Sequence, residues 1–214
     1  MRKVELVAEG FHHAECPRWY RGHLYFSDMQ GHRVYRTEPD SGLTTFCEIP
    51  EPGGLGFTPD GDLLIVSMSD CRIFRLHDGA LTEYADLRSH CRRVNDMVVD
   101  ARGRAYVGDI AVTSAEQFAN PKDARRLHPK SLYRVDPDGS VHLAASGLIC
   151  PNGVVITPDG KTLIVAETFA FRLSAFDIGE DGSLSRRRTW AAFRPEPAAT
   201  MDEDEGADEC EQIE

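Results

Sequence analysis

The sequence lacks the short motifs by which several classes of enzyme are recognised. It has no Gly-x-Ser-x-Gly elbow, which argues against serine-hydrolase chemistry. It has no His-x-x-x-His or Cys-x-x-Cys pair, which argues against a zinc site built from histidine and cysteine. The glycine-rich run at residues 53–56 leads into a strand-like pattern rather than a helix, so it is not a dinucleotide-binding fingerprint.

Long apolar runs and secretion signals are also missing. Runs such as residues 63–66 are far too short to cross a bilayer, no signal peptide precedes the first apolar residues, and Asn-x-Ser/Thr does not occur. We therefore expect a cytoplasmic protein with no membrane partner. The scattered cysteines favour free thiols in a reducing compartment over a disulfide framework. They are Cys16, Cys47, Cys71, Cys91, Cys150 and Cys210.

Basic surface is scarce as well. The net charge of −11 comes mostly from residues 201–214, which carry eight acidic side chains and no basic one. The only compact basic run, Arg186 to Arg188, is expected to be solvated, so nothing favours a nucleic-acid partner.

Basic neighbours could lower the pKa of the Cys91 thiol and so favour a reactive thiolate. No histidine partner is identifiable, however, and a structural role is expected for Cys91.

What the sequence does contain is an internal repeat. The stretch GLGFTPDGDLLIVS at residues 54–67 returns as GVVITPDGKTLIVA at residues 153–166. A weaker copy occupies residues 96–108 and a shortened one residues 16–27. Each copy predicts a short strand, a tight turn and a second strand, because proline presets the turn and the following glycine accepts a positive φ.

Two more strands are predicted after each copy. The third strands are expected at residues 33–36, 72–76, 131–135 and 172–176, and the fourth at residues 44–49, 81–84, 141–144 and 188–193. Helical periodicity is nearly absent, apart from a possible turn or two near residues 115–118. Four strands per unit, at a spacing near forty residues, is typical of propeller blades. A two-sheet sandwich with coincidental turns is the less favoured alternative.

We therefore expect an all-β chain folded as a β-propeller of four-stranded blades, with about four blades present and the ring open or incomplete. The propeller is assigned to residues 1–200 and an acidic loop or tail to residues 201–214. Residues 3–8 are predicted to form an isolated strand that would complete the last blade. The insertion at residues 110–130 either caps the channel mouth or is a solvated excursion.

One position of the repeat gathers polar side chains. Aligning the copies on Trp19, Phe57, Val99 and Ile156 makes four residues equivalent: Glu15, Gly53, Asn95 and Asn152. This position is predicted just ahead of the first strand, which lines the channel of a propeller. Its oxygen donors suit a hard divalent cation, calcium first, with magnesium, manganese or zinc as alternatives. Taken singly, Glu15 reads as a solvated carboxylate and the asparagines as turn formers.

The segments around Glu15, residues 22–28, residues 94–100 and residues 151–160 resemble the senescence marker protein (regucalcin)/gluconolactonase family, and the resemblance covers roughly residues 3–193. It implies a six-bladed propeller with one catalytic divalent metal that hydrolyses lactones. By this resemblance Glu15 and Asn152 are metal ligands, Asn95 lies beside the metal and contacts substrate, and Arg93 binds substrate hydroxyls or carboxylate. The family's third ligand, a catalytic Asp, belongs to a later Pro-Asp-Gly, so its position here is unknown and we expect it beyond residue 214.

Two functions are therefore weighed. The first is metal-dependent hydrolysis of a small lactone or other ester, in which the cation polarises the carbonyl and a carboxylate activates water. The second is a non-catalytic propeller that binds a small ligand or a protein. The shared position of Glu15, Asn95 and Asn152 favours the first.

Overall fold

The computed structural model describes residues 6–38, 42–110 and 129–193, which form four four-stranded antiparallel sheets in chain order. Blade one comprises β1 (Ala14–Tyr20), β2 (His23–Asp28), β3 (Arg33–Thr37) and β4 (Leu43–Glu48). Blade two comprises β5 (Pro52–Phe57), β6 (Leu63–Ser67), β7 (Arg72–His77) and β8 (Ala80–Asp86). Blade three comprises β9 (Val94–Val99), β10 (Ala105–Asp109), β11 (Lys130–Val135) and β12 (Val141–Leu148). Blade four comprises β13 (Pro151–Ile156), β14 (Thr162–Glu167), β15 (Arg172–Ile178) and β16 (Leu184–Ala192), with a single 3₁₀ turn at Thr168–Ala170.

The repeated turn chemistry produces the hairpins that the sequence predicts. Gly61 donates its N–H to the carbonyl of Thr58 at 2.9 Å, and Gly160 donates to Thr157 at 2.8 Å. Both glycines have positive φ, 100° and 72°, a backbone conformation that other residues adopt at a cost. The all-β prediction of four-stranded blades is therefore confirmed.

Three sequence predictions need correction or fall outside the described residues. Residues 6–8 lie in no strand, and they pair with no strand of the described residues, whereas residues 3–5 of this predicted strand lie outside the described residues. The fourth strand of blade four begins at Leu184, not at residue 188. Residues 111–128, which hold most of the predicted insertion and the possible helical turn, are outside the described residues.

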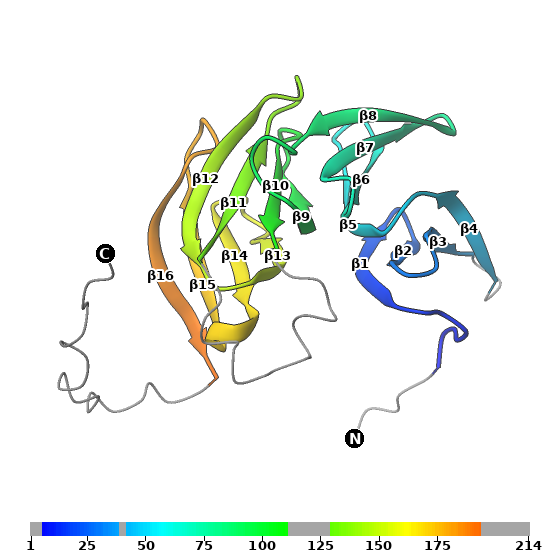
Figure 1. Cartoon of the computed structure of the whole chain (residues 1–214), viewed down its shortest axis with the longest axis horizontal. Coiled ribbons are helices and arrows are strands. Elements are labelled where there is room, and N and C mark those ends of the chain that lie inside the picture. The colour runs from blue at the N-terminus through cyan, green and yellow to red at the C-terminus, as the bar shows by residue number, and fades with distance from the viewer. Residues whose placement is uncertain (1–5, 39–41, 111–128, 194–214) are drawn as a thin grey trace, which may run out of the picture.

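The four blades follow one another round an arc, with blades one and four at its ends (Figure 1). The first strands are the innermost elements, since β5 packs beside both β1 and β9, and β9 packs beside β13. Gly54 and Gly56 allow this close approach. A Cβ at Gly54 would lie 2.3 Å from the backbone nitrogen of Met97, and one at Gly56 would lie 2.4 Å from Val99 Cγ2.

An apolar cluster fills each boundary between neighbouring blades. Tyr25 and Val34 of blade one pack with Leu55 and Ile65 of blade two. The second cluster joins blades two and three and includes Leu64, Val66, Met97 and Val107. The third joins blades three and four and includes Tyr106, Leu132, Val154 and Leu163. Burial of apolar surface therefore holds each blade against the next.

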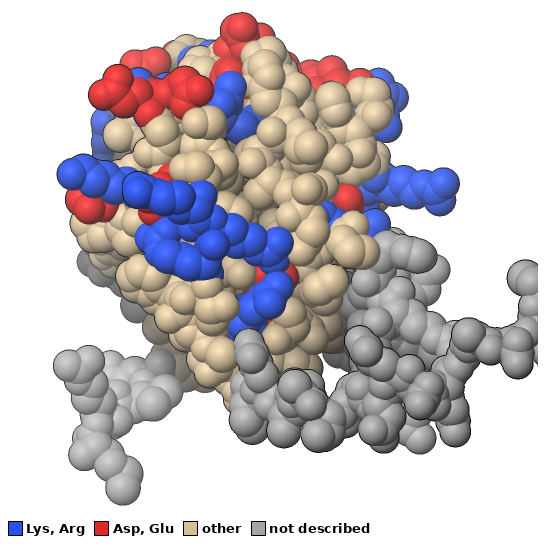
Figure 2. All heavy atoms as spheres, turned by 90° about the vertical axis from the view of Figure 1, so that its left-hand side faces the viewer, with Lys and Arg blue, Asp and Glu red and all other residues tan. Residues whose placement is uncertain are grey.

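The outer edge of blade four is rich in arginine. Figure 2 shows basic side chains gathered on the side of the molecule where β16 lies. Arg188 Nη1 contacts Asp177 Oδ1 at 2.6 Å, Arg186 contacts the same carboxylate, and Arg187 Nη2 contacts Glu167 Oε1 at 2.9 Å. The basic run is exposed, as expected, and it is also charge-compensated by carboxylates of its own blade.

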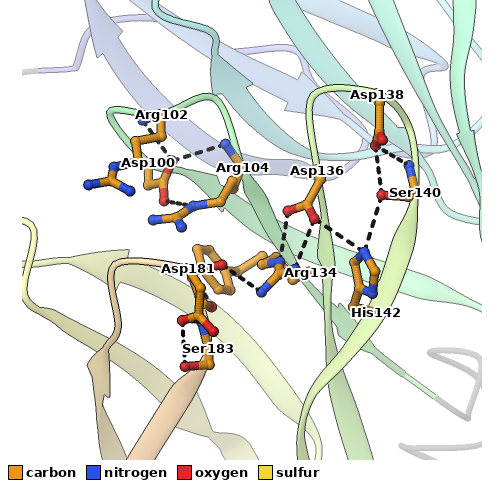
Figure 3. A network of polar contacts seen from close by, with 12 residues as sticks. Asp100, Arg102, Arg104, Arg134, Asp136, Asp138, Ser140, His142, Asp181 and Ser183 are labelled. Atoms are coloured by element: carbon orange, nitrogen blue, oxygen red, sulfur yellow. Dashed lines mark hydrogen bonds and ion pairs between the residues drawn. The ribbon is translucent and has the colours of Figure 1, made fainter.

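A polar network joins blades three and four at the end of the blades away from the starts of the first strands (Figure 3). Its centre is the turn between β15 and β16, whose backbone carbonyls accept hydrogen bonds from blade three. Arg104 Nη1 donates to the carbonyl of Glu180 at 2.9 Å, and Arg134 Nη1 donates to that of Asp181 at 2.9 Å. The Tyr106 hydroxyl donates to the carbonyl of Gly182 at 2.9 Å. These bonds satisfy turn carbonyls that would otherwise be left unpaired at a blade boundary.

Candidate functional site

The strand register shows that the polar position of the repeat occupies the same place in each blade. The first residue of each first strand pairs with the last residue of the second strand: Ala14 with Asp28, Pro52 with Ser67, Val94 with Asp109 and Pro151 with Glu167. The next residues are therefore equivalent in all four blades: Glu15, Gly53, Asn95 and Asn152. Each is the second residue of its strand, one step inside the strand rather than ahead of it. The asparagines belong to strands and are not turn formers.

A second repeated position lies two residues earlier and was not found from the sequence. The same backbone hydrogen bond recurs at every blade: Met29 N–H to His13 (2.9 Å), Met68 to Glu51 (3.0 Å), Ile110 to Arg93 (3.0 Å) and Thr168 to Cys150 (3.1 Å). His13, Glu51, Arg93 and Cys150 are thus equivalent. Counting back two residues from the aligned polar position would have identified them.

The two carboxamides of the polar position meet. Asn95 Nδ2 donates to Asn152 Oδ1 at 3.0 Å, and Asn152 Nδ2 donates to the Thr168 hydroxyl at 3.2 Å. Asn95 is buried, whereas Asn152 is exposed. Residues 57 positions apart in the sequence therefore share one small space.

The two charged members of the predicted site each have a partner from the second position. His13 Nε2 lies 2.9 Å from Glu15 Oε1 within blade one. Arg93 Nη2 lies 3.0 Å from Glu51 Oε2, so this ion pair joins blades three and two. In blade one the side chains of the two repeated positions therefore meet, and in blades two and three the second position carries an ion pair of its own.

A buried ion pair lies beside this group and was also missed. Arg18 Nη2 of β1 contacts Asp96 Oδ1 of β9 at 2.8 Å, and Asp96 accepts hydrogen bonds from the N–H groups of Met97 (2.8 Å) and Val154 (3.3 Å). Burial raises the pKa of the Asp96 carboxyl, and burial likewise raises that of the Cys16 thiol. This pair ties the inner strands of blades one, three and four together next to Glu15, Asn95 and Asn152.

The described cysteines are free, as expected; Cys210 lies outside the described residues. The Sγ atoms of Cys71 and Cys91 are 3.3 Å apart. The hydrogen bond with Cys71, together with burial, raises the pKa of the Cys91 thiol. A raised pKa disfavours the nucleophilic thiolate, which agrees with a structural role for Cys91.

The donor chemistry of the polar position fits a hard cation. Glu15, Asn95 and Asn152 offer carboxylate and carboxamide oxygens, and no nitrogen or sulfur donor shares their position in the blades. Among residues 6–38, 42–110 and 129–193, no group of three or more His, Cys, Asp or Glu residues gathers in a way that would hold a metal. An alternative site of the histidine, cysteine or carboxylate type is therefore not found in this part of the chain.

Comparison with known proteins agrees with this architecture. The family model described as "SMP-30/Gluconolactonase/LRE-like region" matches residues 13–208. Pentonolactonase XacC of Haloferax volcanii is 29% identical over 178 residues, covering 81% of this chain and 56% of the relative. Gluconolactonase of Zymomonas mobilis is 24% identical over 219 residues, covering 90% and 60%.

The solved structures agree too. The gluconolactonase XC5397 of Xanthomonas campestris superposes with a TM-score of 0.71 at 25% identity, covering 87% of this chain and 65% of that protein. The chain thus spans less than two thirds of the length of these relatives. No helix in the described part of the chain is long and apolar enough to cross a bilayer. By the family match over most of its length, the chain belongs to the SMP-30/gluconolactonase/LRE-like family.

Proposed function

We propose that this protein hydrolyses small sugar-type lactones with a divalent cation, calcium first, held at the polar position of the inner strands. The observation that carries the proposal is the equivalence of Glu15, Asn95 and Asn152 in three blades, with Asn95 and Asn152 in contact. A propeller that served only as a scaffold would have no physical reason to place oxygen donors at one repeated inner position. Relatives named pentonolactonase and gluconolactonase support the same reaction class.

The residues of this site have separate roles in the proposal. Glu15 and Asn152 hold the cation, which supplies Lewis-acid polarisation of the lactone carbonyl when bound. Asn95 is buried beside Asn152, where its side chain would contact both the cation and the substrate. Arg93 orients the substrate, because its planar guanidinium presents several N–H donors in a fixed geometry. The small-molecule lactone or ester is the only partner that the proposal requires.

Proton release from a panel of neutral aldonolactones, followed with a pH indicator, tests the proposal. Where the catalytic Asp that the family resemblance implies is also present, we expect turnover that a chelator abolishes and added calcium restores. Glu15→Gln should lower the rate by a factor of ~10² or more, because it removes the negative charge of the carboxylate among the proposed ligands. The matched control is Glu9→Gln, an exposed glutamate in the segment before β1.

Two results would contradict the proposal. Turnover that is insensitive to chelator would remove the metal from the reaction. Saturable binding of sugar ligands without turnover of any lactone would instead favour a non-catalytic propeller that binds a small molecule.

A further inference from the structure

The ion pair between Glu51 and Arg93 joins two neighbouring blades at one repeated position. Both residues immediately precede a first strand, and the carbonyl of each accepts the same recurring hydrogen bond, from the N–H groups of Met68 and Ile110 respectively. Arg93 Nη2 lies 3.0 Å from Glu51 Oε2, and the two side chains are 16% and 31% exposed. The pair is therefore partly shielded from water yet accessible from one side.

Blade one shows which way side chains at this position point. There the equivalent residue, His13, contacts Glu15 at 2.9 Å, two residues further along the chain. Glu51 and Arg93 immediately precede β5 and β9, whose second residues are Gly53 and Asn95. The pair therefore lies at the same end of the inner strands as the polar position, next to the proposed cation site.

Glu51 has hydrogen-bonding capacity to spare. Its Oε2 atom is buried and makes no hydrogen bond with any described residue, although it lies within ion-pair distance of Arg93. Because the Glu51 side chain as a whole is 31% exposed, a ligand hydroxyl that reaches the carboxylate can donate a hydrogen bond to it. The pair thus offers an acceptor and a set of donors side by side, which complements neighbouring hydroxyl groups of a sugar.

The charge of the pair also discriminates between ligands. Glu51 neutralises the charge of Arg93. An anionic group on a ligand is therefore repelled by the Glu51 carboxylate, whereas an arginine without this partner would attract the group. A sulfonate or phosphate would have to displace Glu51 from Arg93 and leave that carboxylate uncompensated, which is costly in a partly buried site. A neutral polyhydroxylated ligand can bind without displacing Glu51 from Arg93.

We propose that Glu51 is a specificity-determining residue, which with Arg93 selects neutral polyhydroxylated lactones and disfavours lactones that carry a sulfonate or phosphate group. This rests on the proposed lactone hydrolysis at the adjoining site. It goes beyond that function by assigning the substrate class to a residue that is not among the proposed metal ligands. The 6-deoxy-6-sulfogluconolactonase of Pseudomonas putida, 26% identical over 197 residues, is named for an anionic lactone, so the family includes both substrate classes.

The test compares Glu51→Gln, which keeps the shape and removes the charge, with Glu83→Gln as a matched control. Glu83 lies in the same blade and also pairs with an arginine, Arg72 Nε at 3.3 Å, but on the outer strands. The ratio of kcat/KM for a 6-phosphorylated aldonolactone to that for its neutral counterpart is measured. We expect this ratio to rise by about tenfold or more in Glu51→Gln and to stay within about twofold in Glu83→Gln. Since position 51 has a φ of 38°, Glu51→Asn is a second variant that tolerates this backbone.

Measured ligand affinities distinguish a failure of this inference from a failure of the proposed reaction. Calorimetric affinities for a neutral hexitol and for its 6-phosphate are measured on the same proteins. If no lactone is hydrolysed but the affinity ratio shifts toward the phosphate in both Glu51 variants, the selectivity stands and the catalytic proposal fails. If neither the kcat/KM ratio nor the affinity ratio shifts in either Glu51 variant, the selectivity is overturned, whatever the lactonase result.

Discussion

The carboxylate of Glu167 offers the sharpest test of what holds blade four together. Glu167 is the last residue of β14, and its side chain is fully buried. Burial alone would raise the pKa of this carboxyl, but the hydrogen bonds that it accepts outweigh burial and hold the pKa at about 2, compared with an ordinary value of 4.5. The donors are the side chains of Arg172, Ser174 and Arg187 and the backbone N–H of Ile149.

The size of the effect follows from this pKa. A drop from 4.5 to about 2 corresponds to about 3 kcal/mol of folding free energy, at about 1.4 kcal/mol for each pH unit. Because the pKa is lower in the folded state, this stabilisation is fully present above about pH 5. It is lost as the pH falls from about 5 to about 2, where the folded protein also takes up the proton.

We therefore predict that Glu167→Gln is less stable than the wild type by about 3 kcal/mol at pH 7, and that the difference shrinks towards zero near pH 2. For a domain of this size, that difference lowers Tm by about 6–12 °C. Urea unfolding of both proteins at pH 7, 5 and 3 measures it, with Glu180→Gln in an exposed turn as control. A difference that stays constant from pH 7 to pH 3 would show that packing, not the charge of Glu167, stabilises the blade.

Three further predictions probe other parts of the molecule. Calorimetric titration with calcium and manganese should show binding to the wild type that weakens at least tenfold in Glu15→Gln; identical isotherms would remove Glu15 from the cation site. Gly54→Ala should cost more than about 3 kcal/mol in urea unfolding, since its Cβ would lie 2.3 Å from a backbone nitrogen, whereas Gly79→Ala, with nothing within 4 Å, should cost about 1 kcal/mol for its positive φ alone; equal losses would refute the close approach of β5 and β9. Tyr106→Phe should cost about 1 kcal/mol in the same assay, because it removes the hydrogen bond to the carbonyl of Gly182, and an unchanged stability would contradict that bond.

Much of the blade architecture could be predicted because it is encoded locally. The Thr-Pro-Asp-Gly turns at residues 58–61 and 157–160 set each hairpin within a few residues, and the alternation of the strands on either side follows from the two-residue period of a β-strand. The repeat then made Glu15, Asn95 and Asn152 equivalent, and the strand register bears out that equivalence. Residues 6–8 show the converse: they belong to a stretch that was predicted as a strand, but they pair with no strand in the described part of the chain.

Contacts between blades were decided by the tertiary structure alone. The distance in sequence between Asn95 and Asn152, between Glu51 and Arg93, or between Arg18 and Asp96 carries no signal that the side chains meet. They meet because apolar clusters fill each blade boundary, and because the glycines of β5 let its backbone lie directly against β9. The sequence alone determined the blades and their shared polar position, whereas the partner of each charged side chain depends on how the inner strands pack, a non-local property that no single repeat contains.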